Sequence, residues 1–481
     1  MKKKHRAHEP NPADKVPLTT RIGWGVGGFA DNAIMNVLNI LGLVLYVDFF
    51  RVPPVLAGIA LFFPRLFDAI TDPLMGNISD NTRTRWGRRR PYILIGAVAS
   101  GIVMPLLWMP PFSSTAGNPW YANGPFLWLC LMGSVYAIAY TLFVVPYTAL
   151  GYELTRDYDE RTRVLSTRVY FYLVGSLSLP WLYRLCKLDF FRNEVVGARW
   201  VSAGFGLLII CCGIIPFLCC RERKEVITQE RISILKAIRC TFTNKPFVIL
   251  LSAYLVVMIG LFSAWSLGMF INIYYVAQGD KLFAGKINGT VGSVCALVSF
   301  LGVYLISSLS TRFSKKVGLI GGLMLTLAGM IAAWFAINPE WPYGQLLSNP
   351  MIALGLQGAF LMINSMVADV CDEDELRTGL RREGMFGAAL SFTQKAALAC
   401  TTLIGGALLT LSGFDAEVAN TTGLPIHIGV RMKTMVLASQ STGLIAAMIL
   451  FIFYPITRKR AEETRRLLEE RKAAAGVTTD D

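Results

Sequence analysis

The chain has 481 residues, of which 54% are hydrophobic and only 16% are charged, and its mean hydropathy is +0.49. Soluble proteins carry about 25% charged residues, so this composition excludes an ordinary soluble fold and indicates a chain that crosses a membrane many times. The net charge of +14 would suggest a nucleic-acid partner in a soluble protein. Here the basic residues fall between apolar segments, so we interpret them as a topology signal and expect no nucleic-acid partner.

Apolar stretches of roughly the 20 residues that a spanning helix requires recur about twelve times. The polar leader before the first stretch lacks the cleavage site of a secretory signal, so that stretch is expected to remain as a helix. We therefore predict an all-α membrane protein with about twelve transmembrane helices. They are placed near residues 22–50, 54–79, 91–110, 125–152, 165–185, 200–220, 246–276, 287–309, 317–338, 347–369, 384–412 and 431–456.

One long polar connection divides the spans six and six. Within it, Ile234, Leu235, Ile238 and Phe242 recur at helical spacing, which predicts an amphipathic helix on the membrane surface. The predicted organisation is a leader at 1–21, a six-helix bundle at 22–220, the linker at 221–245, a second six-helix bundle at 246–457 and a charged tail at 458–481.

Every second connection is basic, which predicts the orientation of the chain because cytoplasmic loops carry an excess of Lys and Arg. The connections at 83–90, 156–163, 312–316 and 377–382 are rich in Arg or Lys, whereas 111–125 carries no charge. The leader and the tail lie on the basic side. We expect both termini in the cytoplasm and the chain in the inner or plasma membrane.

Three charged residues, Arg65, Asp68 and Asp72, lie inside the second predicted span. Each costs at least about 2.5 to 3.5 kcal/mol near the bilayer centre, so a cluster indicates a function. The i, i+4 spacing places both carboxylates on one helix face. There they would bind Na⁺, a hard cation that favours oxygen ligands, or carry a proton in the desolvated carboxyl. The alternative is a static buried pair in which Arg65 neutralises Asp68.

Amide side chains form a stripe on the first predicted span. Asn32, Asn36 and Asn39 lie at i, i+4 and i+7 and therefore share one face. They are expected either to contact a solute or to form interhelical hydrogen bonds worth less than about 2 kcal/mol each. The sequence leaves both interpretations open.

The ten cysteines predict neither a disulfide framework nor a metal centre, because most lie inside apolar spans and none has the spacing of a ligand motif. The three histidines, His5, His8 and His427, lie outside the spans, which argues against a histidine proton relay. No hydrolase, kinase or dinucleotide motif is visible. We expect a protein that is not an enzyme and that uses no cofactor besides a coupling ion.

The two halves echo one another, as in transporters built from repeated bundles. An Arg-rich loop follows the second span at residues 76–90, and a basic segment follows the eighth at 307–316. This layout resembles the major facilitator superfamily. Within it, residues 65–76 (RLFDAITDPLMG) and 85–91 (RWGRRRP) are similar to the glycoside–pentoside–hexuronide:cation symporters, which are melibiose-permease-like proteins. The segment at 372–384 agrees with the same family.

The resemblance implies the major facilitator fold, with two six-helix bundles that alternate access to a central site. It implies cation ligands at Asp68, Asp72 and Thr141. It also implies that Asp31 and Arg168 hydrogen-bond sugar hydroxyls, since charged partners make stronger hydrogen bonds than neutral ones. Asn32 and Asn36 are counted with them as candidate substrate contacts.

Four further residues are candidates for coupling or gating: Arg65, Lys395, Asp80 and Arg88. Lys395 matches a family lysine in the eleventh span and is expected to pair with Asp68 or Asp72 when no cation is bound. The resemblance implies that the loop with Asp80 and Arg88 latches the ends of the second and eleventh spans, with Asp80 near the helix start at Gly384.

The chain departs from the family pattern at three positions. Thr71 stands where the family often has Asn, Val144 replaces an acid that holds sugar hydroxyls, and Thr148 replaces a sugar-stacking aromatic. The expected function is cation-coupled (Na⁺ or H⁺) symport of a glycoside, pentoside or related sugar by a monomeric carrier. One alternative is a carrier of a non-sugar amphipathic or anionic solute such as a lysolipid. A sensor that binds a solute without translocating it is disfavoured by the short tail.

Overall fold

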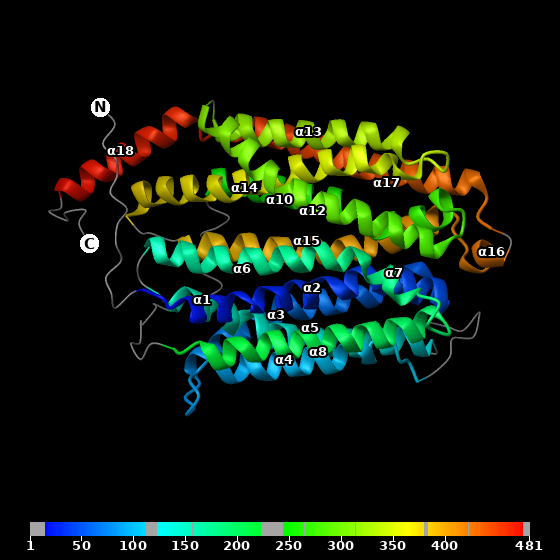
Figure 1. The fold of residues 1–481 in the computed structure, drawn as a ribbon. Coiled ribbons are helices and arrows are strands. Elements are labelled where there is room, and N and C mark those ends of the chain that lie inside the picture. Colours follow the sequence, from blue (N-terminus) through cyan, green and yellow to red (C-terminus); the bar gives the residue numbers. More distant parts are fainter. Residues whose placement is uncertain are drawn as a thin grey trace. The chain divides into compact units, whose positions relative to one another are not determined.

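The computed structural model describes residues 15–111, 123–155, 158–222, 244–263, 265–312, 314–379, 383–421 and 423–474. Within these residues all regular elements are helical, as the composition predicts (Figure 1). Most of the leader and of the amphipathic linker helix predicted at 221–245 lies outside the described residues.

The predicted spans all lie on helical segments (Figure 1). The first half comprises α1 (Leu18–Gly25), α2 (Gly27–Val44) and η1 (Leu45–Phe49); α3 (Pro54–Asn81); α4 (Arg90–Leu106); α5 (Gly124–Glu153); α6 (Tyr158–Ser178), η3 (Leu179–Trp181) and α7 (Leu182–Cys186); and α8 (Glu194–Cys219). The second half comprises α10 (Lys245–Phe262), α11 (Trp265–Phe270) and η4 (Ile271–Val276); α12 (Lys281–Arg312); α13 (Lys315–Ala336); η5 (Pro342–Gly344) and α14 (Gln345–Thr378); α15 (Glu383–Leu411); α16 (Ala416–Thr421); α17 (Ile426–Ile452); and α18 (Arg458–Ala474).

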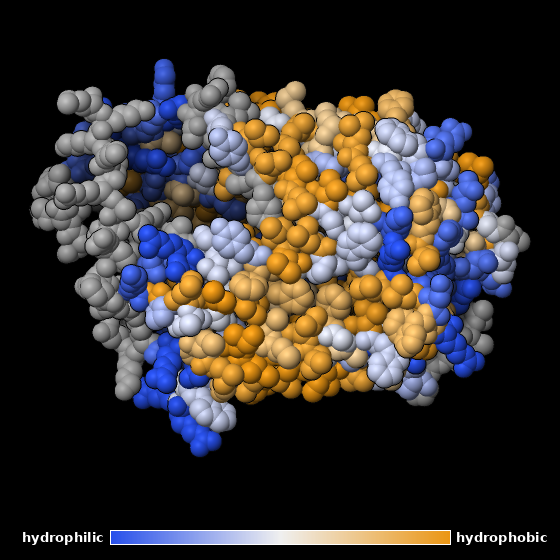
Figure 2. Space-filling model, viewed as in Figure 1, coloured by the Kyte–Doolittle hydropathy of each residue, from blue (hydrophilic) through white to orange (hydrophobic). Residues whose placement is uncertain are grey.

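Ten of the described helices are long and apolar enough to cross a membrane. Helix α4 is apolar but has only 17 residues. Helix α6 begins at Tyr158, seven residues before the predicted start, and its first turns carry charges that lower its hydropathy. Apolar side chains gather over the middle of the helices, and hydrophilic ones lie toward their ends (Figure 2).

The chain forms two compact units, Met1–Ile227 with Asp280–Ser293 and Thr228–Gly279 with Val294–Asp481. The boundary between residues 227 and 228 lies in the predicted linker. The first residues of α12 belong to the first unit, although α12 follows the linker in the chain. Inside the first unit, α4 packs on α5 and α8, and α2 packs on α6 and α8. Inside the second unit, α13 packs on α14 and α17, and α10 packs on α15 and α17. The two packing patterns match span for span, which supports the internal repeat.

The first span of each half also ends in the same way. A π-helical turn closes both spans, η1 in the first half and η4 in the second. Two residues after each turn, the backbone has a positive φ at a residue other than glycine, 56° at Arg51 and 49° at Gln278. Such conformations are uncommon, so their recurrence at equivalent places is further support for the repeat.

Helices α4 and α8 approach each other closely through two glycines. A Cβ atom on Gly206 would lie 2.3 Å from the Gly101 carbonyl oxygen, and one on Gly101 would lie 2.5 Å from the Gly206 carbonyl oxygen. The contacts are to backbone atoms, so a rotamer change cannot relieve them. Small residues that allow such backbone contact are typical of helix packing in membranes.

We expect Gly206→Ala to destabilise the protein by about 1 to 3 kcal/mol, because the added methyl group overpacks the α4–α8 contact. The thermal unfolding midpoint of the purified chain measures the loss. Gly204→Ala on the same helix is the matched control, since a Cβ atom there meets no other atom within 4 Å. Equal midpoints for the two variants would contradict the close approach.

Candidate functional site

The candidate site is built on one face of α5. Tyr136, Tyr140, Phe143 and Tyr147 recur at i, i+4, i+7 and i+11, and the three tyrosines contact the first span. Tyr136 donates a hydrogen bond to the Ile34 carbonyl oxygen at 3.0 Å. The stripe therefore fixes α5 against α2.

A reciprocal hydrogen-bonded pair fixes the end of this interface. The Trp24 indole donates to the Tyr147 carbonyl oxygen at 3.1 Å, and the Tyr147 hydroxyl donates to the Trp24 carbonyl oxygen at 2.9 Å. The rings stack with centroids 5.2 Å apart. Gly151 and Gly27 make room, because Cβ atoms there would lie 2.0 Å from Trp24 and 2.4 Å from Tyr147. This pair therefore fixes how α1 is positioned along α5 beside the site.

An oxygen cluster joins α3 and α5. The Thr141 hydroxyl oxygen lies 3.0 Å from Asp68 Oδ1, 3.3 Å from Asp72 Oδ1 and 3.0 Å from the Thr71 hydroxyl oxygen. Asp68 is 3% exposed and Thr141 is 1% exposed. The three residues predicted as cation ligands therefore lie together, and Thr71 joins them.

The hydroxyl protons are too few for these contacts. Thr141 has one proton and three oxygen neighbours, and the Thr71 hydroxyl also lies 2.8 Å from the Phe67 carbonyl oxygen, to which it donates. One proton cannot serve all the Thr141 contacts at once. The lone pairs around Thr141 are the ligand set that a hard cation such as Na⁺ favours, so the donor chemistry fits a cation.

Arg65 reaches from α3 to α2. Its guanidinium donates to Asn39 Oδ1 at 2.6 Å and to the Met35 carbonyl oxygen at 3.4 Å. A cavity of about 30 Å³ lies among α2, α3 and α5, with Arg65, Asp68 and Tyr140 in its lining. That volume holds a water molecule, so small species fit beside the Asp68 carboxylate.

A second polar cluster lies on the α2 side of α5. The Arg168 guanidinium of α6 pairs with Asp31 Oδ2 at 2.7 Å, and the Tyr140 hydroxyl donates to Asp31 Oδ1 at 3.0 Å. Arg168 also lies over the Tyr147 ring, 5.5 Å from its centroid. The structure thus brings together the acid and base that the sequence singled out, and it adds two tyrosines.

The predicted amide stripe ties helices together. The Asn32 amide donates to the Tyr172 carbonyl oxygen at 2.7 Å and to Ser176 Oγ at 2.8 Å, both on α6. Asn36 donates to Asn32 Oδ1 at 2.7 Å. Both amide protons of Asn32 are therefore used between α2 and α6, which matches the interhelical alternative for this residue.

Asp80 and Arg88 lie in an ionic network at the start of α4. Asp80 pairs with Arg89 at 2.7 Å, and Arg88 pairs with Glu153 of α5. Glu222 accepts the backbone N–H groups of Arg88 and Arg89 at 2.8 Å each, because a helix start favours a negative charge. The predicted position of Asp80 near Gly384 stays a prediction.

Lys395 is a half-buried residue of α15 in the second unit. Its predicted pairing with Asp68 or Asp72 stays a prediction.

Sequence reasoning missed several partners in these clusters. It treated Thr71 only as a departure from the family pattern, and it did not select Tyr140 or Tyr147. A signal for the tyrosines was present, since aromatic residues recur along one face of the fourth span. The pairing of Thr71 with Thr141 has no local signal, because it joins two helices.

Comparisons with known proteins agree with this architecture. A family model described as "MFS/sugar transport protein" matches residues 23–458. An uncharacterized symporter of Synechocystis is 27% identical, over 96% of this chain and 98% of that protein. The putative glycoside/cation symporter YagG of Escherichia coli is 25% identical, over 97% of this chain and 98% of its own length.

Two further proteins are similar at lower sequence identity. Sodium-dependent lysophosphatidylcholine symporter 1 of Xenopus tropicalis is 23% identical, over 95% of this chain and 90% of that protein. A crystal structure of a D-xylose–proton symporter has a TM-score of 0.60 at 17% identity, covers 91% of this chain and 97% of that chain, and so shows a shared fold. The chain is therefore a multi-pass membrane protein that belongs to the MFS/sugar transport family, within the branch of symporters that resemble the glycoside–pentoside–hexuronide:cation carriers.

Proposed function

We propose that the protein couples the movement of a cation, bound at Asp68, Asp72 and Thr141, to the symport of a sugar such as a glycoside or pentoside. The two halves alternate access to the central site, as in transporters built from repeats. The cation raises the affinity for the solute, and the solute raises the affinity for the cation, because binding coupling is reciprocal. The carrier acts as a monomer in the plasma membrane.

The oxygen cluster around Thr141 carries this proposal. A proton needs only one carboxylate. This cluster instead gathers two carboxylates and the Thr71 hydroxyl within 3.3 Å of the Thr141 hydroxyl oxygen. Oxygen ligands of this kind suit a hard metal cation. Na⁺ is therefore the first ion to test, with H⁺ as the second.

The Asp31–Arg168 pair supports a polar solute. Arg168 carries several donors in a planar fork and Asp31 carries acceptors only, so the pair offers both kinds of partner to hydroxyl groups. Tyr140 supplies a hydroxyl and an aromatic ring beside it. A sugar has hydroxyl groups that can bond to these donors and acceptors, and an apolar ring face that can pack on an aromatic ring.

An amphipathic anionic solute is the alternative, supported by the similarity to a lysophosphatidylcholine symporter. Val144 and Thr148 remove an acid and an aromatic from the sugar pattern. Counterflow into proteoliposomes separates the two solute classes. A panel of labelled glycosides and pentosides should exchange under a Na⁺ gradient, and exchange of lysophosphatidylcholine alone would favour the alternative.

We expect Asp68→Asn together with Asp72→Asn to abolish ion-driven accumulation in proteoliposomes, because amides lack the negative charge that holds the cation. Uptake under Na⁺ and under H⁺ gradients measures the loss. The control is Asp189→Asn, an exposed position outside both clusters. Ion-dependent accumulation that survives the double substitution would overturn the proposal.

Thr141→Val should weaken cation binding roughly tenfold, since a hydroxyl contact is worth about 1.4 kcal/mol at such a site. Thr141→Ser keeps the hydroxyl and should restore binding. Cation titrations of purified protein measure both. Ser134→Ala on the same helix removes a hydroxyl that donates to the Cys130 carbonyl oxygen of its own helix. Identical affinities in Thr141→Val and Ser134→Ala would rule out Thr141 as a ligand.

Tyr140→Phe should raise the half-saturating solute concentration about fivefold, because it removes one hydrogen bond to Asp31. The cation affinity measured without solute should stay unchanged. The best-exchanging sugar of the panel serves as the probe. Tyr152→Phe, at the exposed end of α5, is the matched control. A change in cation affinity alone would assign Tyr140 to the ion site instead.

A further inference from the structure

Two lysines tie α13 to α17 at opposite ends. Lys433 of α17 donates to the carbonyl oxygens of Trp334 and Ile337 at 3.1 Å each, where α13 ends. Lys316 of α13 donates to the Ile452 carbonyl oxygen at 2.7 Å, where α17 ends. A cation at a helix C-terminus satisfies free carbonyls and the helix dipole. The two helices are therefore clamped reciprocally.

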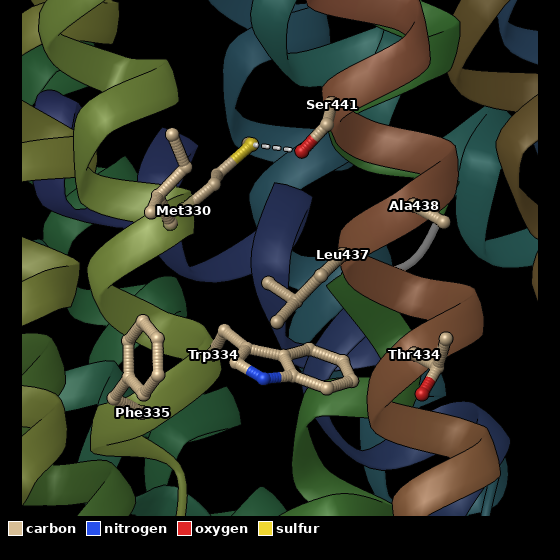
Figure 3. A pocket seen from close by; sticks show the side chains of 8 residues that line it. Met330, Trp334, Phe335, Thr434, Leu437, Ala438 and Ser441 are labelled. Carbon is tan, nitrogen blue, oxygen red and sulfur yellow. Dashed lines mark hydrogen bonds between the residues drawn. The ribbon is translucent and has the colours of Figure 1, made fainter.

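A groove lies between the clamped helices (Figure 3). Its volume is about 390 Å³. It is lined by Met330, Ile331, Trp334 and Phe335 of α13 and by Thr434, Leu437, Ala438 and Ser441 of α17. The floor is buried, with Met330 2% exposed, and the rim is open, with Phe335 72% exposed. Ser441 donates to the Met330 sulfur at 3.8 Å and narrows one end.

The lining suits a hydrocarbon chain. It is apolar apart from two hydroxyls and the Trp334 indole N–H, and both helices are long and apolar enough to cross a membrane. Thr434 and Ser441 lie about 10 Å apart along α17 at 1.5 Å per residue. An open apolar groove on a membrane-crossing surface meets acyl chains, so a lipid tail is the occupant that its chemistry selects.

Basic residues mark the headgroup end of the groove. His427, Arg431, Thr434 and Ala438 lie at i, i+4, i+7 and i+11, so they share the groove face of α17. His427 and Arg431 are exposed, and we find no ion pair of Arg431 among the described residues. The buried Lys433 adds a charge that carbonyls and aromatic rings, not carboxylates, surround in the described structure. This end of the groove therefore attracts an anion.

We propose that this groove binds one acyl chain of an anionic phospholipid, with the lipid phosphate at Arg431. The site lies wholly on α13 and α17 of the second unit. It is independent of the oxygen cluster and of transport, so its test does not depend on the proposed function.

Trp334 provides the readout, because brominated acyl chains quench a tryptophan that they touch. The full chain is reconstituted in phosphatidylcholine vesicles with increasing brominated phosphatidylglycerol or, in a parallel series, brominated phosphatidylcholine. Subtracting the signal of Trp334→Phe isolates Trp334. We expect phosphatidylglycerol to quench at an about fivefold lower mole fraction, the preference expected of one basic residue at a membrane surface.

Two variants test the parts of the site. Arg431→Gln should remove the preference for phosphatidylglycerol, and Ala438→Phe should reduce quenching by both lipids because it fills the groove. Ile445→Phe, exposed on α17 but outside the groove, should change neither. Lipid retained through purification, measured as the ratio of phosphatidylglycerol to phosphatidylcholine, should fall in Arg431→Gln. Equal quenching by the two lipids, or a preference that survives Arg431→Gln, would overturn the proposal.

Discussion

The reciprocal hydrogen bonds between Trp24 and Tyr147 are the constraint on which the first unit depends. Both partners are buried aromatic residues, and each uses its own polar atom to satisfy the other's carbonyl oxygen. Gly151 and Gly27 are required because a Cβ atom there would clash with the Trp24 ring and the Tyr147 ring, respectively. Trp24 lies on α1, and only Val26 separates α1 from α2, so this contact also positions the start of α2, where Asp31 faces α5. The ionic and polar clusters farther along the helices follow from that position.

The two carboxylate clusters that α5 contacts are arranged in different ways. Asp31 and Arg168 neutralise each other directly, and a tyrosine hydroxyl satisfies the remaining carboxylate oxygen. Asp68 and Asp72 instead converge on one hydroxyl group, that of Thr141. Burying charge is costly unless partners compensate for the lost water. Each arrangement therefore gives the carboxylates inside a span polar partners on a neighbouring helix.

Hydropathy predicted the membrane class and the helices, because both depend on patterns within one segment, and the repeat was predicted from similar loop motifs in the two halves. Charge inside an apolar span likewise pointed to Asp68 and Asp72. The start of α6 was misplaced because charged residues continue its helix beyond the apolar part. The contact of Thr71 with Thr141 joins two helices, so no pattern within one segment predicts it. The π-helical turns after α2 and α11 also have no periodic signal in the sequence.

Tyr140 and Thr141 are consecutive residues of one helix, yet one contacts Asp31 and the other contacts Asp68 and Asp72. Neighbouring side chains on an α-helix point about 100° apart. A small axial rotation of α5 therefore shortens contacts on one side while lengthening those on the other. A single peptide unit is therefore the mechanical link between the two polar clusters, without a relay of intervening groups.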